Sequence, residues 1–299
     1  MTRALVIGEA LTDIVAGREL PGGSPMNVAV ALGRLGREVD FASWIGPDGR
    51  GQAIEDHLAA SRVRLLEGSR AAPRTSTATV RLDADGQARY VFDLLWDFSP
   101  PPAADLAVVH TGSLATICPP GAAKVAAFVE SVRAGGEAGP TVTFDPNLRP
   151  AVTRDPAAAR PLIERLAAAS DVVKASDEDL AHLYGGDPER AAADWAKAGP
   201  AVVVVTRGGA GAKAWCAAGV VELAARPARV VDTVGAGDTF MAGLIDGLWR
   251  QGLAGAGRRR QLRAIGLPQL EAAMDRAARA AAVTVGRAGA DPPWSFELP

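Results

Sequence analysis

A glycine-rich turn followed by an acidic residue is the stretch of this sequence that points most directly to chemistry. Gly235, Ala236 and Gly237 precede Asp238, and apolar residues recur at a four-residue step from Phe240 onward, as on one face of a helix. The first turn of a helix has unpaired backbone N–H groups and partial positive charge, so it suits a phosphate. A carboxylate beside that phosphate can take a proton from a substrate hydroxyl, as alcohol phosphorylation requires. The same carboxylate could instead only complement the helix dipole, and the residues alone do not decide between the two.

Two other kinds of phosphate-binding loop do not fit this turn. It lacks the Gly-Lys-Ser/Thr ending of a P-loop, and Phe240 stands where a dinucleotide-binding fingerprint has its third glycine. An NAD-dependent oxidoreductase is therefore the weakest of the enzyme hypotheses.

The nine residues Asp-Thr-Val-Gly-Ala-Gly-Asp-Thr-Phe at 232–240 resemble the C-terminal signature of the ribokinase-like (PfkB) sugar kinases. This resemblance implies that Gly235, Ala236 and Gly237 form the anion hole for the transferred phosphate. It also implies that Asp238 is the catalytic base.

Residues near the N-terminus are candidates for the sugar site. Asp13 follows the first predicted strand, at residues 3–7, and ligands of open α/β sheets collect beyond strand ends; a turn or capping role is the alternative. Gly22 and Gly23 allow close approach of a ligand, and Asn27 can donate and accept hydrogen bonds. These residues match the family's Gly-Gly-x-x-x-Asn-x-Ala element, which implies that they orient the sugar.

Two further segments lie at the ends of predicted strands. The run Phe-Asp-Pro-Asn-Leu-Arg-Pro at 144–150 resembles an element of the fructokinase and 2-keto-3-deoxygluconate kinase branch, which implies that Arg149 reaches the active site. An Asx-turn with a surface arginine is the alternative. The run from Lys174 to Asp179 resembles the family's Asn-x-x-Glu element with Ser176 and Asp179 in place of both residues. It implies contact of Lys174 with the cofactor and of Asp179 with Mg²⁺, while a capping serine remains the alternative.

The nucleotide and cation contacts follow from the resemblance alone. Residues 206–211 match the family's Thr-x-Gly-x-x-Gly, so Thr206, Gly208 and Gly211 are the expected ATP contacts. Relatives often bind a monovalent cation, such as K⁺, beside the loop that matches Asp232.

Alternating strand and helix patterns predict an α/β fold with a doubly wound, mostly parallel sheet flanked by helices, and the resemblance implies that this fold is ribokinase-like. Residues 73–90 instead predict a hairpin with its turn at 83–86. The resemblance implies a small β-sheet lid, formed by residues 9–17 and 72–95, within a single kinase domain of residues 1–299. Lid strands in this family often pair across a homodimer.

Composition excludes several function classes. With 32 basic and 34 acidic residues and a net charge of -2, the chain offers no electrostatic case for nucleic acid or an anionic membrane. Its two cysteines and three histidines show no disulfide or zinc spacing, and no apolar run approaches the ~20 residues of a membrane helix. We expect a cytoplasmic protein, with the arginines at 258–260 in a solvated loop.

Together these observations predict an ATP-dependent sugar kinase with Mg²⁺, acting on fructose. The alternatives are a 2-keto-3-deoxygluconate kinase, because Arg149 could pair with a substrate carboxylate, and a sugar-binding protein without catalysis.

Overall fold

A large sheet forms the centre of the molecule. The computed structural model describes residues 3–82, 88–103 and 105–298. In it nine strands are ordered β13-β12-β11-β10-β9-β8-β1-β4-β5, all parallel except the hairpin of β12 and β13 at one edge. Their bounds are β1 (Arg3–Ile7), β4 (Val39–Ala42), β5 (Val63–Leu65), β8 (Leu106–Gly112), β9 (Thr141–Asp145), β10 (Val172–Ser176), β11 (Val202–Thr206), β12 (Ala212–Cys216) and β13 (Gly219–Leu223).

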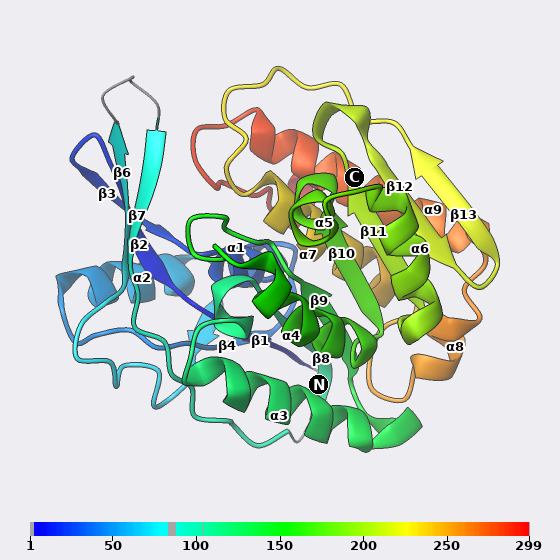
Figure 1. Cartoon of the computed structure of the whole chain (residues 1–299), viewed down its shortest axis with the longest axis horizontal. Coiled ribbons are helices and arrows are strands. Elements are labelled where there is room, and N and C mark those ends of the chain that lie inside the picture. Colours follow the sequence, from blue (N-terminus) through cyan, green and yellow to red (C-terminus); the bar gives the residue numbers. More distant parts are fainter. Residues whose placement is uncertain (1–2, 83–87, 104, 299) are drawn as a thin grey trace.

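Helices cover both faces of this sheet (Figure 1). One face carries α1 (Ser24–Arg34), α2 (Gly49–Ala60), α7 (Ala236–Arg250), α8 (Arg259–Arg263) and α9 (Leu267–Val285). The other carries α3 (Gly121–Ala134), α4 (Pro156–Ala168), α5 (Asp177–Tyr184) and α6 (Pro188–Ala198). Short 3₁₀ turns lie at Ser113–Thr116, Gly136–Ala138, Gly208–Ala210 and Ser295–Glu297.

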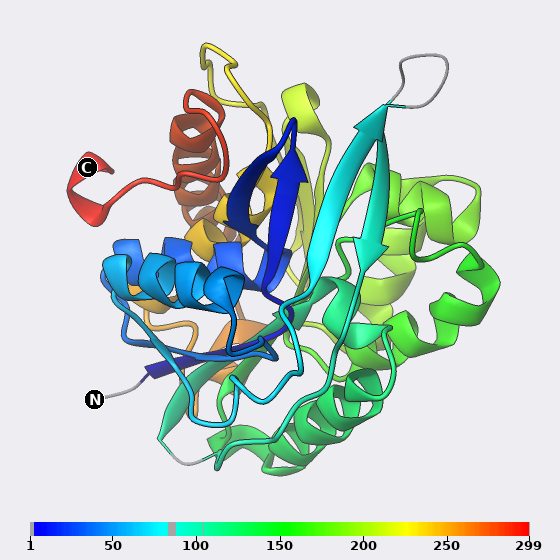
Figure 2. The ribbon, with the colours of Figure 1, turned by 90° about the vertical axis from the view of Figure 1, so that its left-hand side faces the viewer.

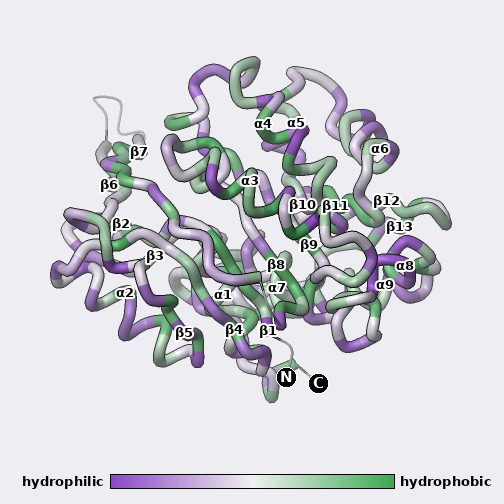
Figure 3. The backbone as a smooth tube through the Cα atoms, turned by 90° about the horizontal axis from the view of Figure 1, so that it is seen from below, coloured by the Kyte–Doolittle hydropathy of each residue, from purple (hydrophilic) through white to green (hydrophobic). Residues whose placement is uncertain are grey.

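The sheet is apolar on both faces because its strands lie between two helical layers. In β11, Val202 and Val204 pack on the α7 side, whereas Val203 and Val205 pack on the α6 side. Such continuous apolar strands are typical of parallel sheets covered on both faces. Figure 3 shows hydrophobic segments gathered where the central strands and α7 lie.

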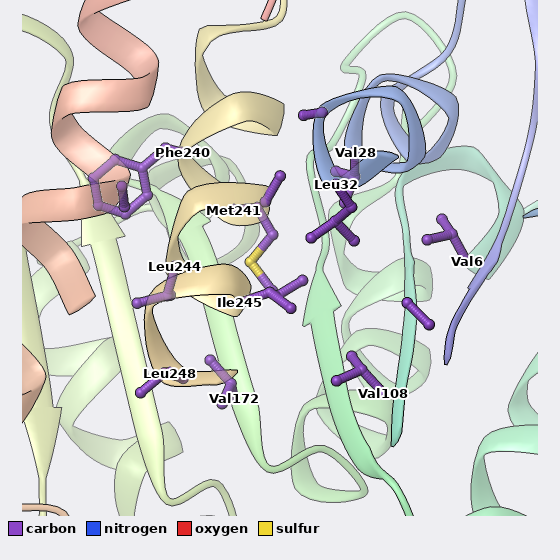
Figure 4. Packing of buried hydrophobic residues seen from close by; sticks show 14 of the residues in the cluster. Val6, Val28, Leu32, Val108, Val172, Phe240, Met241, Leu244, Ile245 and Leu248 are labelled. Atoms are coloured by element: carbon purple, nitrogen blue, oxygen red, sulfur yellow. The ribbon is translucent and has the colours of Figure 1, made fainter. Parts of the chain in front are cut away.

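Helix α7 is buried along most of its length, and its packing holds the predicted catalytic turn at its N-terminus in place. Met241 and Ile245 point toward α1 and are fully buried (Figure 4). On another side, Gly243 lets α9 approach closely, because a Cβ atom at Gly243 would lie 2.7 Å from the Cα atom of Ala277. Packing of this density leaves the first turn of α7 little freedom to move.

A second sheet stands beside the first (Figure 2). Its order is β3-β2-β6-β7, with bounds β2 (Leu11–Val15), β3 (Arg18–Gly22), β6 (Thr77–Leu82) and β7 (Ala88–Asp93). The antiparallel pairing of β6 with β7 matches the predicted hairpin, whose predicted turn lies outside the described residues. Strand β3 adds residues 18–22, which lie outside the predicted lid segments.

Two local expectations are wrong. Residues 224–231, whose sequence reads as an extended run leading to the catalytic turn, form no strand, since β13 ends at Leu223. Arg259, expected in a solvated loop, is 1% exposed and begins α8. Its guanidinium donates to the Asp171 carboxylate (3.0 Å) and to the Pro140 carbonyl (2.9 Å).

Across the three described ranges, no helix has both the length and the apolar character needed to cross a bilayer.

Candidate active site

The glycine turn before α7 has the backbone that its sequence predicts. Gly235 has φ of 74°, in the left-handed region that glycine adopts readily, and caps α7, which begins at Ala236. A Cβ atom at Gly235 would also lie 2.5 Å from the Cβ atom of Ala290. Both facts explain why a residue with a side chain does not fit at this position.

Asp238 lies in the first turn of α7 and is buried at 5% exposure. Its Oδ1 atom accepts hydrogen bonds from Ser24 Oγ (2.6 Å) and Asn147 Nδ2 (3.0 Å). Its Oδ2 atom accepts one from Asn27 Nδ2 (2.8 Å). The carboxylate therefore lies where α1, α7 and the loop after β9 meet.

Ser24 and Asn147 were not among the predicted site residues. Ser24 lies inside the Gly-Gly-x-x-x-Asn element and Asn147 inside the Asp-Pro-Asn-Leu-Arg run, so both motifs held the signal. What the sequence does not reveal is that both side chains converge on Asp238.

The predicted sugar residues from the small sheet lie beside this carboxylate. Burial raises the pKa of Asp13 to about 6; the charge of Arg149 lowers it and that of Asp238 raises it. A Cβ atom at Gly22 would lie 2.0 Å from Asp13 Oδ2, so only glycine leaves room for that side chain. Gly23 has φ of 115° and lies against the Glu9 carbonyl. The structure thus brings Asp13, Gly22 and Gly23 together with Asp238.

Arg149 is partly buried and directed back onto its own loop. Its Nη1 atom donates to Asn147 Oδ1 (2.5 Å) and to the carbonyls of Asn147 (3.1 Å) and Leu148 (3.1 Å). The positive charge of Arg149 lowers the pKa of both Asp13 and Glu9. Burial has the opposite effect on Glu9 and raises the pKa of its carboxyl to about 7. Arg149 therefore lies close enough to act on these two carboxyl groups, but it is partly engaged by neighbouring backbone.

Lys174 lies beside the first turn of α7. Its Nζ atom is 2.8 Å from Asp145 Oδ2, and a Cβ atom at Gly237 would lie 3.1 Å from that nitrogen. Burial raises the pKa of Asp145 to about 6, although the Lys174 ammonium opposes the rise. The second carboxylate oxygen of Asp145 is buried and has no hydrogen-bond partner among the described residues.

Ser176 has the capping role that the sequence left open, and Asp179 completes a capping box with it. The Oδ2 atom of Asp179 accepts from the backbone N–H (2.9 Å) and the hydroxyl (2.7 Å) of Ser176, and Ser176 Oγ accepts from the Asp179 N–H. Its Oδ1 atom accepts from the backbone N–H of Leu148 (2.7 Å). Both oxygens are thus engaged, and the magnesium contact of Asp179 stays a prediction.

A pocket of about 550 Å³ opens next to the catalytic turn. Thr206, Gly208 and Gly211, the predicted ATP contacts, line one side, and Ala236 and Gly237 line another. Alanines of α9 and of the irregular segment after β13 supply part of the remaining walls: Ala278, Ala281, Ala282, Ala224, Ala225 and Ala228. A mostly apolar pocket that ends at a helix N-terminus suits a nucleotide with its phosphates toward that helix.

Comparison with known proteins identifies the family. Residues 3–296 match the family described as pfkB family carbohydrate kinase. The protein is a member of the pfkB family of carbohydrate kinases.

Relatives of this kinase include several fructokinases. The chain is 37% identical over 264 residues to a fructokinase of Klebsiella pneumoniae, covering 83% of this chain and 85% of the relative. Among solved structures, a fructokinase of Xylella fastidiosa with bound ATP has 25% identity and a TM-score of 0.80, covering 100% of this chain and 96% of the other. A double mutant of a Vibrio cholerae fructokinase with fructose, ADP and potassium ion has 26% identity and a TM-score of 0.78, covering 97% and 94%.

In the kinase, Asp232 ties the catalytic turn to the C-terminal loop. Its Oδ1 atom accepts from the Val234 N–H (3.0 Å) and its Oδ2 atom from the Gly289 N–H (2.9 Å). These backbone donors lower the pKa of Asp232. Its predicted contact with a monovalent cation stays a prediction. Within the part of the chain that the structure describes, no group of three or more His, Cys, Asp or Glu side chains is placed to hold a metal.

Proposed function

We propose that this kinase is an ATP-dependent fructokinase, which transfers the γ-phosphoryl group of ATP to a hydroxyl of fructose. The observation that carries the proposal is the position of Asp238. It lies between the sugar-side residues Asp13 and Asn27 and the pocket that ends at Gly237. The fructokinase relatives favour fructose over the keto-acid sugar as the acceptor.

The reaction assigns one task to each part of the site. Asp13, Gly22, Gly23 and Asn27 orient the sugar, and Thr206, Gly208 and Gly211 contact ATP. The first turn of α7, at Gly235, Ala236 and Gly237, receives the transferring phosphoryl group, where fixed N–H dipoles oppose the developing negative charge. Asp238 accepts the proton of the attacking hydroxyl. Holding the two reactants in line supplies much of the rate enhancement.

Mg²⁺ is the metal that we propose for the nucleotide. It prefers one or two carboxylates, with phosphate oxygens and waters completing its shell. The Asp145 oxygen that has no hydrogen-bond partner in the described part of the chain is buried near the first turn of α7 and fits that need, directly or through a water. When bound, the ion would neutralise charge on the phosphates.

We also propose a monovalent cation near Asp232, where the catalytic turn meets the C-terminal loop. The Vibrio cholerae relative was solved with a potassium ion. Activity measured with K⁺ and then with a bulky organic cation at equal ionic strength tests this: equal rates would contradict it.

The small sheet is proposed to act as a lid over the sugar within a single kinase domain, since it carries Asp13 and Gly22 to the site and would exclude water.

Four apolar side chains of this sheet are 43 to 51% exposed: Val15, Leu20, Tyr90 and Val91. A homodimer through this sheet would cover them. Sedimentation of wild type and Tyr90→Glu tests it, with a monomeric wild type as the contrary result.

A screen of acceptors tests the proposed function. Sugar-dependent ADP release is measured with fructose, 2-keto-3-deoxygluconate and ribose, at equal ATP and magnesium. We expect the highest kcat/KM with fructose. Preference for the keto-acid would move the assignment to that kinase, and absence of ADP release with any sugar would indicate a binding protein.

Both cysteines are unpaired, consistent with the cytoplasmic location that we propose.

A further inference from the structure

We propose that Asn147 is a positioning residue for the catalytic base. Together with Ser24 it occupies Oδ1 of Asp238, so that Oδ2 is the oxygen that takes the proton from the sugar. The inference rests on the proposed function, in which Asp238 is the base.

The hydrogen-bond partners fix the orientation of the Asn147 amide. The Arg149 guanidinium has only donors, so the Asn147 atom that it contacts at 2.5 Å is the acceptor Oδ1. The amide nitrogen therefore faces the other way. It lies within hydrogen-bond distance of both Ser24 Oγ (2.6 Å) and Asp238 Oδ1 (3.0 Å).

The Ser24 hydroxyl continues this arrangement. It accepts from Asn147 Nδ2 and has one proton to donate, and the nearby Asp238 Oδ1 at 2.6 Å receives it. Ser24 and Asn147 therefore both donate to Oδ1 of Asp238. Asn147 also donates to the Ser24 hydroxyl.

Counting lone pairs separates the two oxygens of Asp238. A carboxylate oxygen accepts about two hydrogen bonds in its plane. Oδ1 has two donors, Ser24 and Asn147, whereas Oδ2 has one donor, Asn27, among the described residues. The lone pair that remains for a substrate hydroxyl is therefore on Oδ2, the oxygen that Asn27 orients.

The backbone around Asn147 is held in an uncommon conformation. Asn147 has φ of 35° and Ser113 has φ of 53°, both in the left-handed region that non-glycine residues rarely adopt. Ser113 Oγ donates to the Asn147 carbonyl at 3.3 Å, and the next N–H, that of Leu148, donates to Asp179. Strain of this kind persists where surrounding contacts impose it, and it is concentrated at functional sites. Here it directs the amide at the base.

The first test removes each donor separately. Asn147→Gly deletes the amide but keeps a residue that tolerates positive φ. Ser24→Ala deletes the hydroxyl. We expect kcat to fall roughly 100-fold for Asn147→Gly, the order expected of a misplaced reacting group, with KM for fructose and for ATP changed less than about threefold. Ser24→Thr restores the hydroxyl and should recover most of the kcat lost in Ser24→Ala.

Ser170→Ala is the matched control. Ser170 is a buried serine after α4 whose hydroxyl donates to the Leu166 carbonyl at 2.7 Å. Its loss tests the cost of deleting a buried hydroxyl away from the site, and kcat should be unchanged.

A double-mutant cycle separates positioning of the base from general loss of structure. If Asn147 acts through Asp238, Asn147→Gly should change the residual turnover of Asp238→Asn less than about twofold. An equal loss in both backgrounds, or an unchanged kcat in Asn147→Gly and Ser24→Ala, overturns the inference while the proposed function stands. Full turnover by Asp238→Asn alone overturns the proposed function instead. If Asn147→Gly does not fold, the same comparisons are made with Ser24→Ala.

Discussion

The ammonium group of Lys174 lies 2.8 Å from the Asp145 carboxylate, and the two side chains are 3% and 1% exposed. They come from neighbouring strands of the sheet, β10 and β9, and Lys174 ends beside Gly237. The N-terminus of α7 is already a region of partial positive charge, so an ammonium there needs a carboxylate beside it. The pair therefore holds a second positive group next to the proposed position of the transferring phosphate.

Lys174→Met is expected to destabilise the protein by roughly 3–5 kcal/mol, because it leaves Asp145 buried without its cation. The double variant Lys174→Met with Asp145→Leu should regain much of that stability, since neither charge remains, but not the turnover. Urea unfolding and kcat are the measurements. A single variant as stable as wild type, or a double variant with full turnover, would contradict this reading.

Sugar affinity is expected to rise with pH through about 6, because burial raises the pKa of Asp13 to about 6 and the ionised form accepts hydrogen bonds from sugar hydroxyls better. Between its ordinary value of 3.8 and 6, the folded state binds more protons than the unfolded state. The stability that Asp13 contributes is therefore lost as pH rises through that interval.

The measurement is kcat/KM for fructose on both sides of pH 6, in wild type and in Asp13→Asn. The asparagine variant should lack the rise centred near 6. A rise of the same size in both proteins would assign it to another group, such as Glu9, whose pKa burial raises to about 7.

Gly22→Ala is expected to raise KM for fructose roughly tenfold, equivalent to about 1.4 kcal/mol, because its Cβ atom would lie 2.0 Å from Asp13 Oδ2. KM for ATP should not change, since Gly22 does not line the nucleotide pocket. Gly49→Ala is the control, because a Cβ atom there meets nothing within 4 Å. Equal effects on the two substrates would show that Gly22 acts on the fold rather than on the sugar site.

Replacement of Arg259 by Met should destabilise the protein by roughly 1.5–3 kcal/mol, since it removes a buried, charged hydrogen bond to Asp171, which keeps Arg133 as a second partner. Arg260→Met, at an exposed neighbouring position, is the control and should leave the unfolding midpoint nearly unchanged. Equal midpoints for the two variants would show that the buried pair contributes little.

The parts of the site that could be predicted from the sequence are those built from adjacent residues. Gly235, Gly237 and Asp238 are neighbours in the chain, and the glycine turn that begins α7 dictates their arrangement locally. The fold class followed from alternating strand and helix patterns for the same reason. The hairpin at β6 and β7 also rests on a local pattern.

Contacts between distant residues could not be predicted in this way. Ser24 and Asn147 meet Asp238 across 214 and 91 positions of sequence, and only the packing of α1 and α7 against the sheet brings them together. The prediction of a solvated loop was wrong for Arg259 because a run of arginines usually lies at a surface. The carboxylate that pairs with the buried Arg259 belongs to a residue 88 positions away. Local composition contains no signal for such partners.

Asp238→Asn tests the central claim most directly, because the amide keeps the size of the side chain but cannot accept the proton from the hydroxyl. Fructose-dependent ADP release should fall by roughly 10²–10⁴-fold, the usual contribution of a general base, while calorimetry should show fructose and ATP still binding. Turnover equal to that of wild type would contradict the role of Asp238 as the base.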